Sequence, residues 1–143
     1  MRIPLMLLLL SGIAFKACSQ HDYLVFGKGG GISGEVTEYV ILHNGKVYKG
    51  SGSAEINISY RGKIRKSDTR KLYKEFEDIA DTSFSHPGNM FYYIKKVGEN
   101  TEYKYTWGDT GFEVSDQVRN LYRNTMVKLS GLTFKPVKKS VKY

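Results

Sequence analysis

The chain has 143 residues, of which 41% are hydrophobic and 13% aromatic, with one cysteine and a formal net charge of +8. This composition is that of one globular domain with a hydrophobic core, and the lone cysteine excludes a scaffold held by internal disulfides. The positive charge lies at the two ends. Without Arg2, Lys16 and the four lysines of the last nine residues, 16 of the 22 basic residues remain, against 14 acidic ones. A body so close to neutral argues against a nucleic-acid partner, and none is expected.

Residues 1–17 are predicted to be an export signal. Arg2 precedes an apolar run from Ile3 to Phe15, which is about 13 residues long, against the roughly 20 that a membrane-spanning helix needs. Phe15-Lys16-Ala17-Cys18 resembles a relaxed lipobox, the motif at which a bacterial lipoprotein is cleaved and its cysteine acylated. The resemblance implies that the mature chain starts at Cys18 and is held on the membrane by acyl groups such as palmitate. The alternative is an ordinary secretory signal cleaved near Ala17, which leaves a free thiol.

The alternation of apolar and polar residues predicts the strands of a sheet. In chain order these are Tyr23–Phe26, Glu35–Leu42, Lys46–Lys49, Ile56–Tyr60, Met90–Val97 and Thr101–Trp107. Asn44-Gly45 predicts a tight hairpin between the second and third strands. In the second strand, Glu38 falls on the same face as the valines, whereas Tyr39 and its neighbours at a spacing of two fall on the other.

Two helices are predicted from apolar residues at helical spacing. The first is capped by Ser67 or Asp68 and ends near Asp81, and the second is capped by Ser115 and ends near Leu129. The resulting order, β-β-β-β-α-β-β-α, predicts an α+β fold with an antiparallel sheet of about six strands and both helices on one face. The domain is expected to span residues 18–134, followed by a basic tail at 135–143.

Glycine-rich and aromatic segments supply the candidate binding residues. The run Gly27–Gly34 is followed by a strand rather than a helix, so it does not match a phosphate-binding loop and is predicted to be a turn, a bulge or a partner-contacting loop. The segments 87–93 and 103–109 combine turn residues with aromatics that either pack in the core or stack a sugar or a peptide. The candidate partner-binding residues are Gly29, Gly30, Gly31, Asn89, Tyr92, Trp107 and Asp109.

No catalytic residue, metal ligand or cofactor site is predicted. None of the histidines, His21, His43 and His86, is at metal-ligand spacing from another, and no nucleophile motif is present. The lysines of the tail are predicted to lie in a solvated end, or to bind anionic lipid or polysaccharide. They are Lys135, Lys138, Lys139 and Lys142.

Three stretches, Phe26–Tyr39, Pro87–Tyr92 and Thr106–Asp109, resemble a group of small Bacteroidota lipoproteins without an assigned activity. The resemblance implies an envelope location and a single domain, and it transfers no catalytic role. The predicted function is a non-catalytic, lipid-anchored envelope domain that binds a protein or a glycan. One acidic residue among positions 19–22 favours a periplasm-facing place on the outer membrane. The alternatives are a loop-inserting inhibitor of a secreted hydrolase and, less favoured, an envelope carbohydrate-active enzyme.

Overall fold

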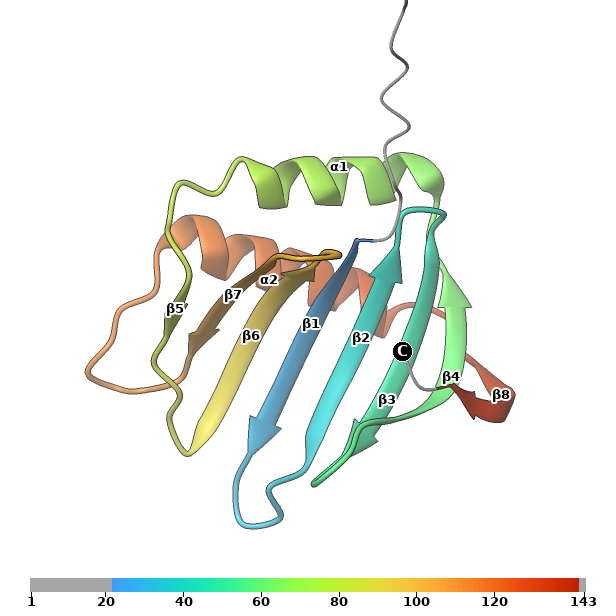
Figure 1. Cartoon of the computed structure of the whole chain (residues 1–143), viewed down its shortest axis with the longest axis horizontal. Helices are drawn as coiled ribbons and strands as arrows, with labels where there is room; N and C mark the ends of the chain where they lie inside the picture. The colour runs from blue at the N-terminus through green and yellow to red at the C-terminus, as the bar shows by residue number, and fades with distance from the viewer. Residues whose placement is uncertain (1–21, 142–143) are drawn as a thin grey trace, which may run out of the picture.

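The computed structural model describes residues 22–141, which form one sheet and two helices (Figure 1). The helices are α1 (Lys66–Glu77) and α2 (Asp116–Ser130). The strands are β1 (Tyr23–Gly30), β2 (Val36–Leu42), β3 (Lys46–Gly52), β4 (Asn57–Lys63), β5 (Phe84–Ser85), β6 (Met90–Val97), β7 (Glu102–Trp107) and β8 (Lys135–Val141). The predicted α+β class is confirmed.

The sheet has the strand order β5-β7-β6-β1-β2-β3-β4-β8. Neighbouring strands are antiparallel, except that the short β5 runs parallel to β7. The first strand in the chain therefore lies near the middle of the sheet, between β6 and β2. Because β1 lies near the middle of the sheet, its two ends lie at opposite ends of the domain (Figure 1).

The sequence underestimated the number of strands, because the described residues contain eight rather than about six. One addition is β5, which has only two residues and is too short to show a period. The other is β8, formed by residues predicted to be a basic tail, which pairs with β4 through Arg61 and Lys135. Cys18 and Lys142 lie outside the described residues.

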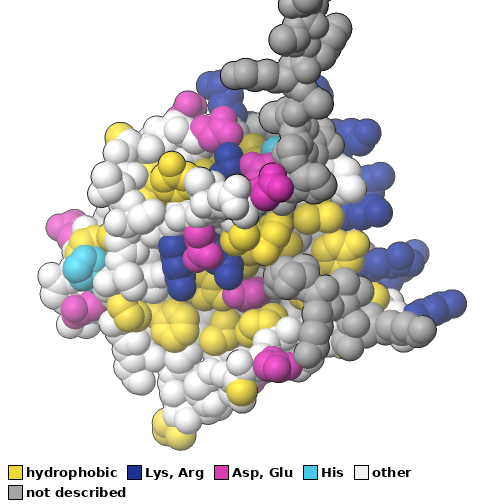
Figure 2. All heavy atoms as spheres, in the orientation of Figure 1, with side chains coloured by type: hydrophobic (Ala, Val, Ile, Leu, Met, Phe, Trp, Pro, Cys, Tyr) yellow, Lys and Arg dark blue, Asp and Glu magenta, His cyan; other side chains and the backbone are white. Residues whose placement is uncertain are grey.

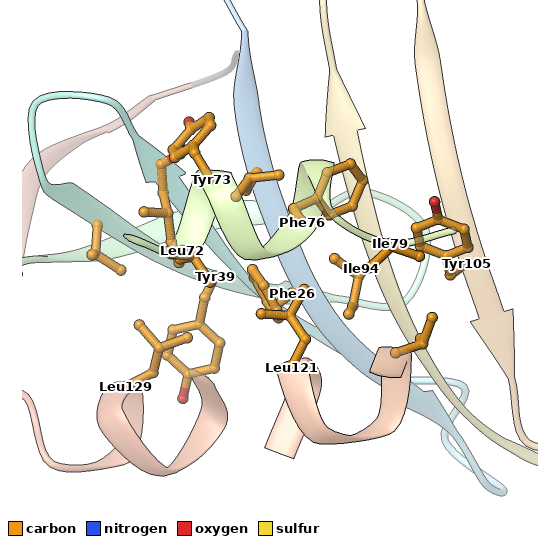
Figure 3. Packing of buried hydrophobic residues seen from close by; sticks show 14 of the residues in the cluster. Phe26, Tyr39, Leu72, Tyr73, Phe76, Ile79, Ile94, Tyr105, Leu121 and Leu129 are labelled. Carbon is orange, nitrogen blue, oxygen red and sulfur yellow. The ribbon is translucent and has the colours of Figure 1, made fainter. Parts of the chain in front are cut away.

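Both helices pack on the same side of the sheet (Figure 1). Phe26 of β1 is fully buried between them, beside Phe76 of α1 and Leu121 of α2 (Figure 3). The strand residues on this side alternate with those on the other, as the period of two requires. The main core comprises Leu24, Phe26, Tyr39, Ile41, Val47, Leu72, Tyr73, Phe76, Ile79, Ile94, Tyr105, Val114, Val118, Leu121 and Leu129.

The N-terminal cap of α2 agrees with the prediction, whereas the N-terminal cap of α1 differs from it. The Ser115 side chain caps α2 by accepting a hydrogen bond from the Val118 amide at 3.4 Å. In contrast, the cap residue of α1 is Arg65, two residues before the nearer predicted cap, and it makes no side-chain capping bond. Asp68, one of the two predicted caps, pairs instead with the Arg65 guanidinium at 2.9 Å. Tertiary packing therefore sets the start of α1.

Neither helix of residues 22–141 covers the other side of the sheet, which has a small core of its own. Val25, Val40 and Tyr93 are buried there. Glu38 is also buried, and its carboxylate accepts a hydrogen bond from the Tyr93 hydroxyl. The Tyr93 ring lies directly over Gly27, where an added Cβ would stand 2.1 Å from the ring. Glycine at this position is therefore required by close approach.

A charged cluster fixes the start of β1. Nε2 of His43 lies 2.6 Å from one carboxylate oxygen of Asp22, and Nζ of Lys96 lies 3.2 Å from the other. Lys96 also reaches Glu77 of α1 at 3.0 Å. Burial alone raises the pKa of the Asp22 carboxyl, but hydrogen bonds with His43 and Lys96 outweigh it and hold the pKa below the ordinary value of 3.8.

Replacing Asp22 by asparagine should destabilise the domain by about 1 kcal/mol at neutral pH. Because the native pKa of Asp22 is lowered, its contribution is present above 3.8 and is lost as the pH falls through the lower native value. Urea unfolding of both proteins at pH 7 and at about pH 2 measures this dependence. A difference of the same size at both pH values would show that the carboxylate charge is not responsible.

Candidate functional site

The glycine run and the two aromatic segments, 87–93 and 103–109, meet at one end of the sheet, where β1 ends and β6 begins. The Gly31 amide donates to the Asn89 carbonyl at 2.9 Å. An added Cβ on Gly30, whose φ is +106°, would stand 2.0 Å from the same carbonyl oxygen. The glycines and Asn89 therefore hold two chain segments together through their backbones.

Asp109 likewise stabilises the turn in which it lies. Its backbone amide donates to the His86 carbonyl at 3.0 Å, and its carboxylate accepts from the Gly111 amide at 3.0 Å. Neither hydrogen bond involves Tyr92 or Trp107, the two aromatic residues of the predicted set. Of the seven predicted partner-binding residues, Tyr92 and Trp107 therefore line a groove with their side chains. The other five do not line this groove.

This groove, which we call the α2 groove, lies between α2 and the helix-covered side of the sheet. It has a volume of about 530 Å³. Strands β1, β2, β6 and β7 form one wall, and one face of α2 forms the other. The α2 groove is lined by Lys28, Tyr39, Tyr92, Trp107, Arg119, Tyr122, Arg123, Met126, Val127 and Ser130. A volume of this size is in the range of small-ligand sites.

Three aromatic rings form the floor of the α2 groove. Tyr92 and Trp107 are directly opposed on adjacent strands, with their ring centroids 6.0 Å apart and their planes 29° from parallel. Tyr122 stands almost perpendicular to Trp107, at 88° with centroids 5.1 Å apart. The floor therefore offers rings in two orientations, which is the arrangement that favours stacking on one side of a ligand and edge contact on another.

Tyr122 is fixed in place by its hydroxyl, which donates to the Gly27 carbonyl at 3.1 Å. Burial raises the pKa of this phenol above its ordinary value, so it stays neutral and keeps its donor at physiological pH. The hydrogen bond joins α2 to the end of β1 across 95 positions of the chain. It leaves the Tyr122 ring rigid, and a rigid ring loses little entropy when a ligand packs on it.

Three cations surround the aromatic floor, and no aspartate or glutamate is among the residues that line the α2 groove. Arg119 donates to Asp116 at 3.4 Å and to the Val114 carbonyl at 3.2 Å. Arg123 donates to the Asn120 side chain at 2.9 Å. Within residues 22–141, neither Lys28 nor Arg123 has a carboxylate within ion-pair distance. The α2 groove is therefore electropositive as well as aromatic.

A second hollow of about 370 Å³ continues from the α2 groove toward the β1–β2 loop. It shares Lys28 and Tyr92 with the α2 groove and adds the hydroxyls of Ser33 and Thr37. The loop beyond it ends in Ile32, which is fully exposed. Together the two hollows form a long open surface rather than an enclosed pocket.

The sequence pointed to Tyr92 and Trp107 but not to the opposite wall of the groove. Helical spacing alone places Tyr122 and Met126 on the inner apolar stripe of the second helix, but each side chain is only partly buried. A usable signal is the row Arg119–Arg123 beside the row Tyr122–Met126, each at a spacing of four. A basic row beside an apolar row on one helix indicates a rim rather than a core.

Neither metal ligation nor membrane spanning is seen in residues 22–141. No group of three or more histidine, aspartate or glutamate side chains there is arranged to hold a metal ion. Neither described helix has the length and apolar character needed to cross a bilayer.

No protein-family model matches the chain, and no curated protein sequence matches it. The likeness to Bacteroidota lipoproteins seen in the sequence motifs is therefore neither supported nor opposed by these comparisons.

Proposed function

We propose that this chain is a lipid-anchored protein of the bacterial cell envelope whose domain binds a ligand without catalysis. The predicted leader before Cys18 supports the anchor, because its apolar run is the length of a signal-peptide core and not of a spanning helix. Acylation at Cys18 accounts for the single cysteine of an exported chain. The short, weakly acidic segment 19–22 supports a periplasm-facing position on the outer membrane.

The α2 groove is the observation that carries the binding function. An exposed concave surface with three mutually packed aromatic rings and several fixed polar groups has the properties of a recognition site. Tyr92 and Trp107, chosen from the sequence as partner-binding residues, are in contact there. An envelope protein or glycan is the class of ligand that fits the proposed location.

Substitution of Val127 tests the binding function with little risk to the fold. Val127 is 67% exposed on the rim of the α2 groove, so Val127→Glu should change stability by no more than about 0.5 kcal/mol. It places a carboxylate beside the aromatic floor and should reduce ligand capture about tenfold. The measurement is a pull-down from detergent-solubilised envelopes, with protein and glycan fractions both quantified.

Asn124→Glu is the matched control, because Asn124 is exposed on another face of the same helix and does not line the α2 groove. It should recover the same material as the native protein. Equal recovery by all three proteins would contradict a binding function for this groove.

The alternative, an inhibitor of a secreted hydrolase, is favoured by one feature. The β1–β2 loop extends past the end of the sheet (Figure 1) and places the fully exposed Ile32 at its tip. Gly31 and Gly34 have φ values of +76° and +62°, so they allow a tight loop. An apolar residue on a projecting loop is the geometry required for insertion into an enzyme's cleft. An envelope carbohydrate-active enzyme has no comparable feature in its favour.

A basic edge supports a further contact with anionic lipid or polysaccharide. Lys and Arg side chains gather along the β4–β8 edge of the sheet (Figure 2). Lys135 is paired with Arg61 in register, and both are exposed, as is Lys138. Near an anionic surface each such cation contributes roughly 1 kcal/mol.

A further inference from the structure

We propose that the ligand of the α2 groove is an acidic polysaccharide, bound along its length with its sugar rings on the aromatic floor and its carboxylates on Arg123 and Lys28. This inference rests on the proposed binding function and assigns the ligand class. It is drawn from three features of the described residues: the ring geometry, the absence of lining carboxylates in the α2 groove, and the open shape.

The ring geometry favours a flat, C–H-rich ring. Tyr92 and Trp107 are half-buried, so part of each ring stays accessible in the groove. The two rings stack on each other with their planes 29° from parallel, and Tyr122 stands edge-on to both of them. Apolar ring faces exclude water and attract the slightly positive C–H groups of a pyranose face, while sugar hydroxyls remain free to hydrogen-bond at the rim.

The charges favour an anion. Arg123 has five N–H donors, and one bond, to Asn120, is made within the described residues. Its guanidinium is therefore available for a bidentate pair with a carboxylate. Lys28 supplies a second cation from the opposite wall. Lys28 and Arg123 line the same groove as the three rings, so a sugar ring stacked there would have two cations within the groove to receive its charged group.

The shape favours a chain over a single small molecule. The α2 groove runs into the adjoining hollow at Lys28 and Tyr92. That hollow offers the hydroxyls of Ser33 and Thr37, and it contains one carboxylate, Glu35. Hydroxyl side chains beside an electropositive aromatic floor match a polymer that carries many hydroxyls. Such a polymer would also carry a carboxylate on every sugar or on every second sugar.

Single-stranded nucleic acid is the competing polymer, since it also combines rings with negative charge. Its affinity depends on neutralising many phosphates, and three cations line the α2 groove. Residues 22–141 carry 19 basic against 14 acidic side chains, but the three lysines of β8 lie on the β4–β8 edge and do not line the α2 groove. The acidic polysaccharide is therefore the better match.

Trp107 makes the test direct, because it is the single tryptophan of the chain and lies in the α2 groove. The purified acylated protein in detergent micelles is titrated with a galacturonic acid hexamer, with the same hexamer methyl-esterified, and with a thymidine hexanucleotide. The ester retains the rings and most hydroxyls but lacks the charge. The acid should change Trp107 emission and bind about tenfold more tightly than the ester.

Arg123→Glu should weaken binding of the acid about tenfold and leave the ester unchanged. Arg70→Glu is the matched control, because Arg70 is exposed on α1 and does not line the α2 groove; it should bind as the native protein does. Thermal unfolding confirms that both variants are folded.

Three results would overturn the ligand class. Equal affinities for acid and ester would show that charge is not recognised, and tighter binding of the oligonucleotide would assign the α2 groove to nucleic acid. Unchanged emission with all three probes would also refute the class, and the Val127→Glu pull-down then decides whether the binding function stands without it.

Discussion

Replacing Cys18 by serine should move the protein from the membrane fraction to the soluble fraction. The reason is that the proposed acyl chains are the attachment: one chain binds a bilayer only reversibly, whereas two or more hold stably, and a hydroxyl at this position receives none. The variant is expressed behind an ordinary cleavable leader, so that an unprocessed apolar run does not itself hold the chain. Salt-washed membranes and supernatant are then compared by quantitative immunoblot, and nearly complete redistribution is expected.

Intact mass spectrometry of the native protein provides the control for this experiment. The mature chain should begin at Cys18 and exceed its polypeptide mass by the mass of its acyl groups. A chain that begins with an unmodified thiol and leaves the membrane in salt would refute the anchor. The binding properties of the α2 groove would not be affected by that outcome.

Replacing Gly27 by alanine should destabilise the domain by about 3 kcal/mol. A Cβ at this position would stand 2.1 Å from the Tyr93 ring, so the ring must shift. Tyr93 is 5% exposed and hydrogen-bonds the buried Glu38 carboxylate, and a displaced hydroxyl would withdraw from that carboxylate. Overpacking and a weakened buried hydrogen bond therefore act together. Equilibrium urea unfolding at neutral pH gives the free energy of unfolding directly.

Gly131→Ala is the comparison for this result. Gly131 follows α2 with an ordinary φ of −85°, and an added Cβ would meet its nearest neighbour, the Lys128 carbonyl, at 3.6 Å. The free energy of unfolding of Gly131→Ala should stay within about 0.5 kcal/mol of the native value. Equal losses in the two variants would mean that the Tyr93 contact is not the cause.

The parts of the fold that were predictable have a strong local period. The alternation in β2 placed Tyr39 and Ile41 on one side and Val40 on the other, and the structure has them so. The end strand β8 was not predictable in the same way, because its lysine-rich sequence has the composition of a solvated tail. It is a strand because β4 offers an unpaired edge, and that information lies some 75 positions away in the chain.

The candidate site was predictable on one wall only. The open end of the β6–β7 hairpin brought Tyr92 and Trp107 together, as expected from hairpin geometry. Tyr122 and the two arginines come from a helix whose position over the sheet depends on long-range packing. Local patterns do not encode which strands a helix crosses, so the second wall and its charge emerged only with the structure.

The clamp on Asp22 determines how an acylated domain would be presented to its surroundings. Asp22 is held by His43 and Lys96, and a chain from Cys18 to Asp22 reaches at most about 14 Å. The pole of the molecule that carries the β2–β3 turn would then rest on the headgroups. The eight residues of β1 extend about 25 Å to the opposite pole, where the β1–β2 loop is found (Figure 1). Such a mounting turns that loop away from the bilayer, so it would meet large partners from the aqueous side.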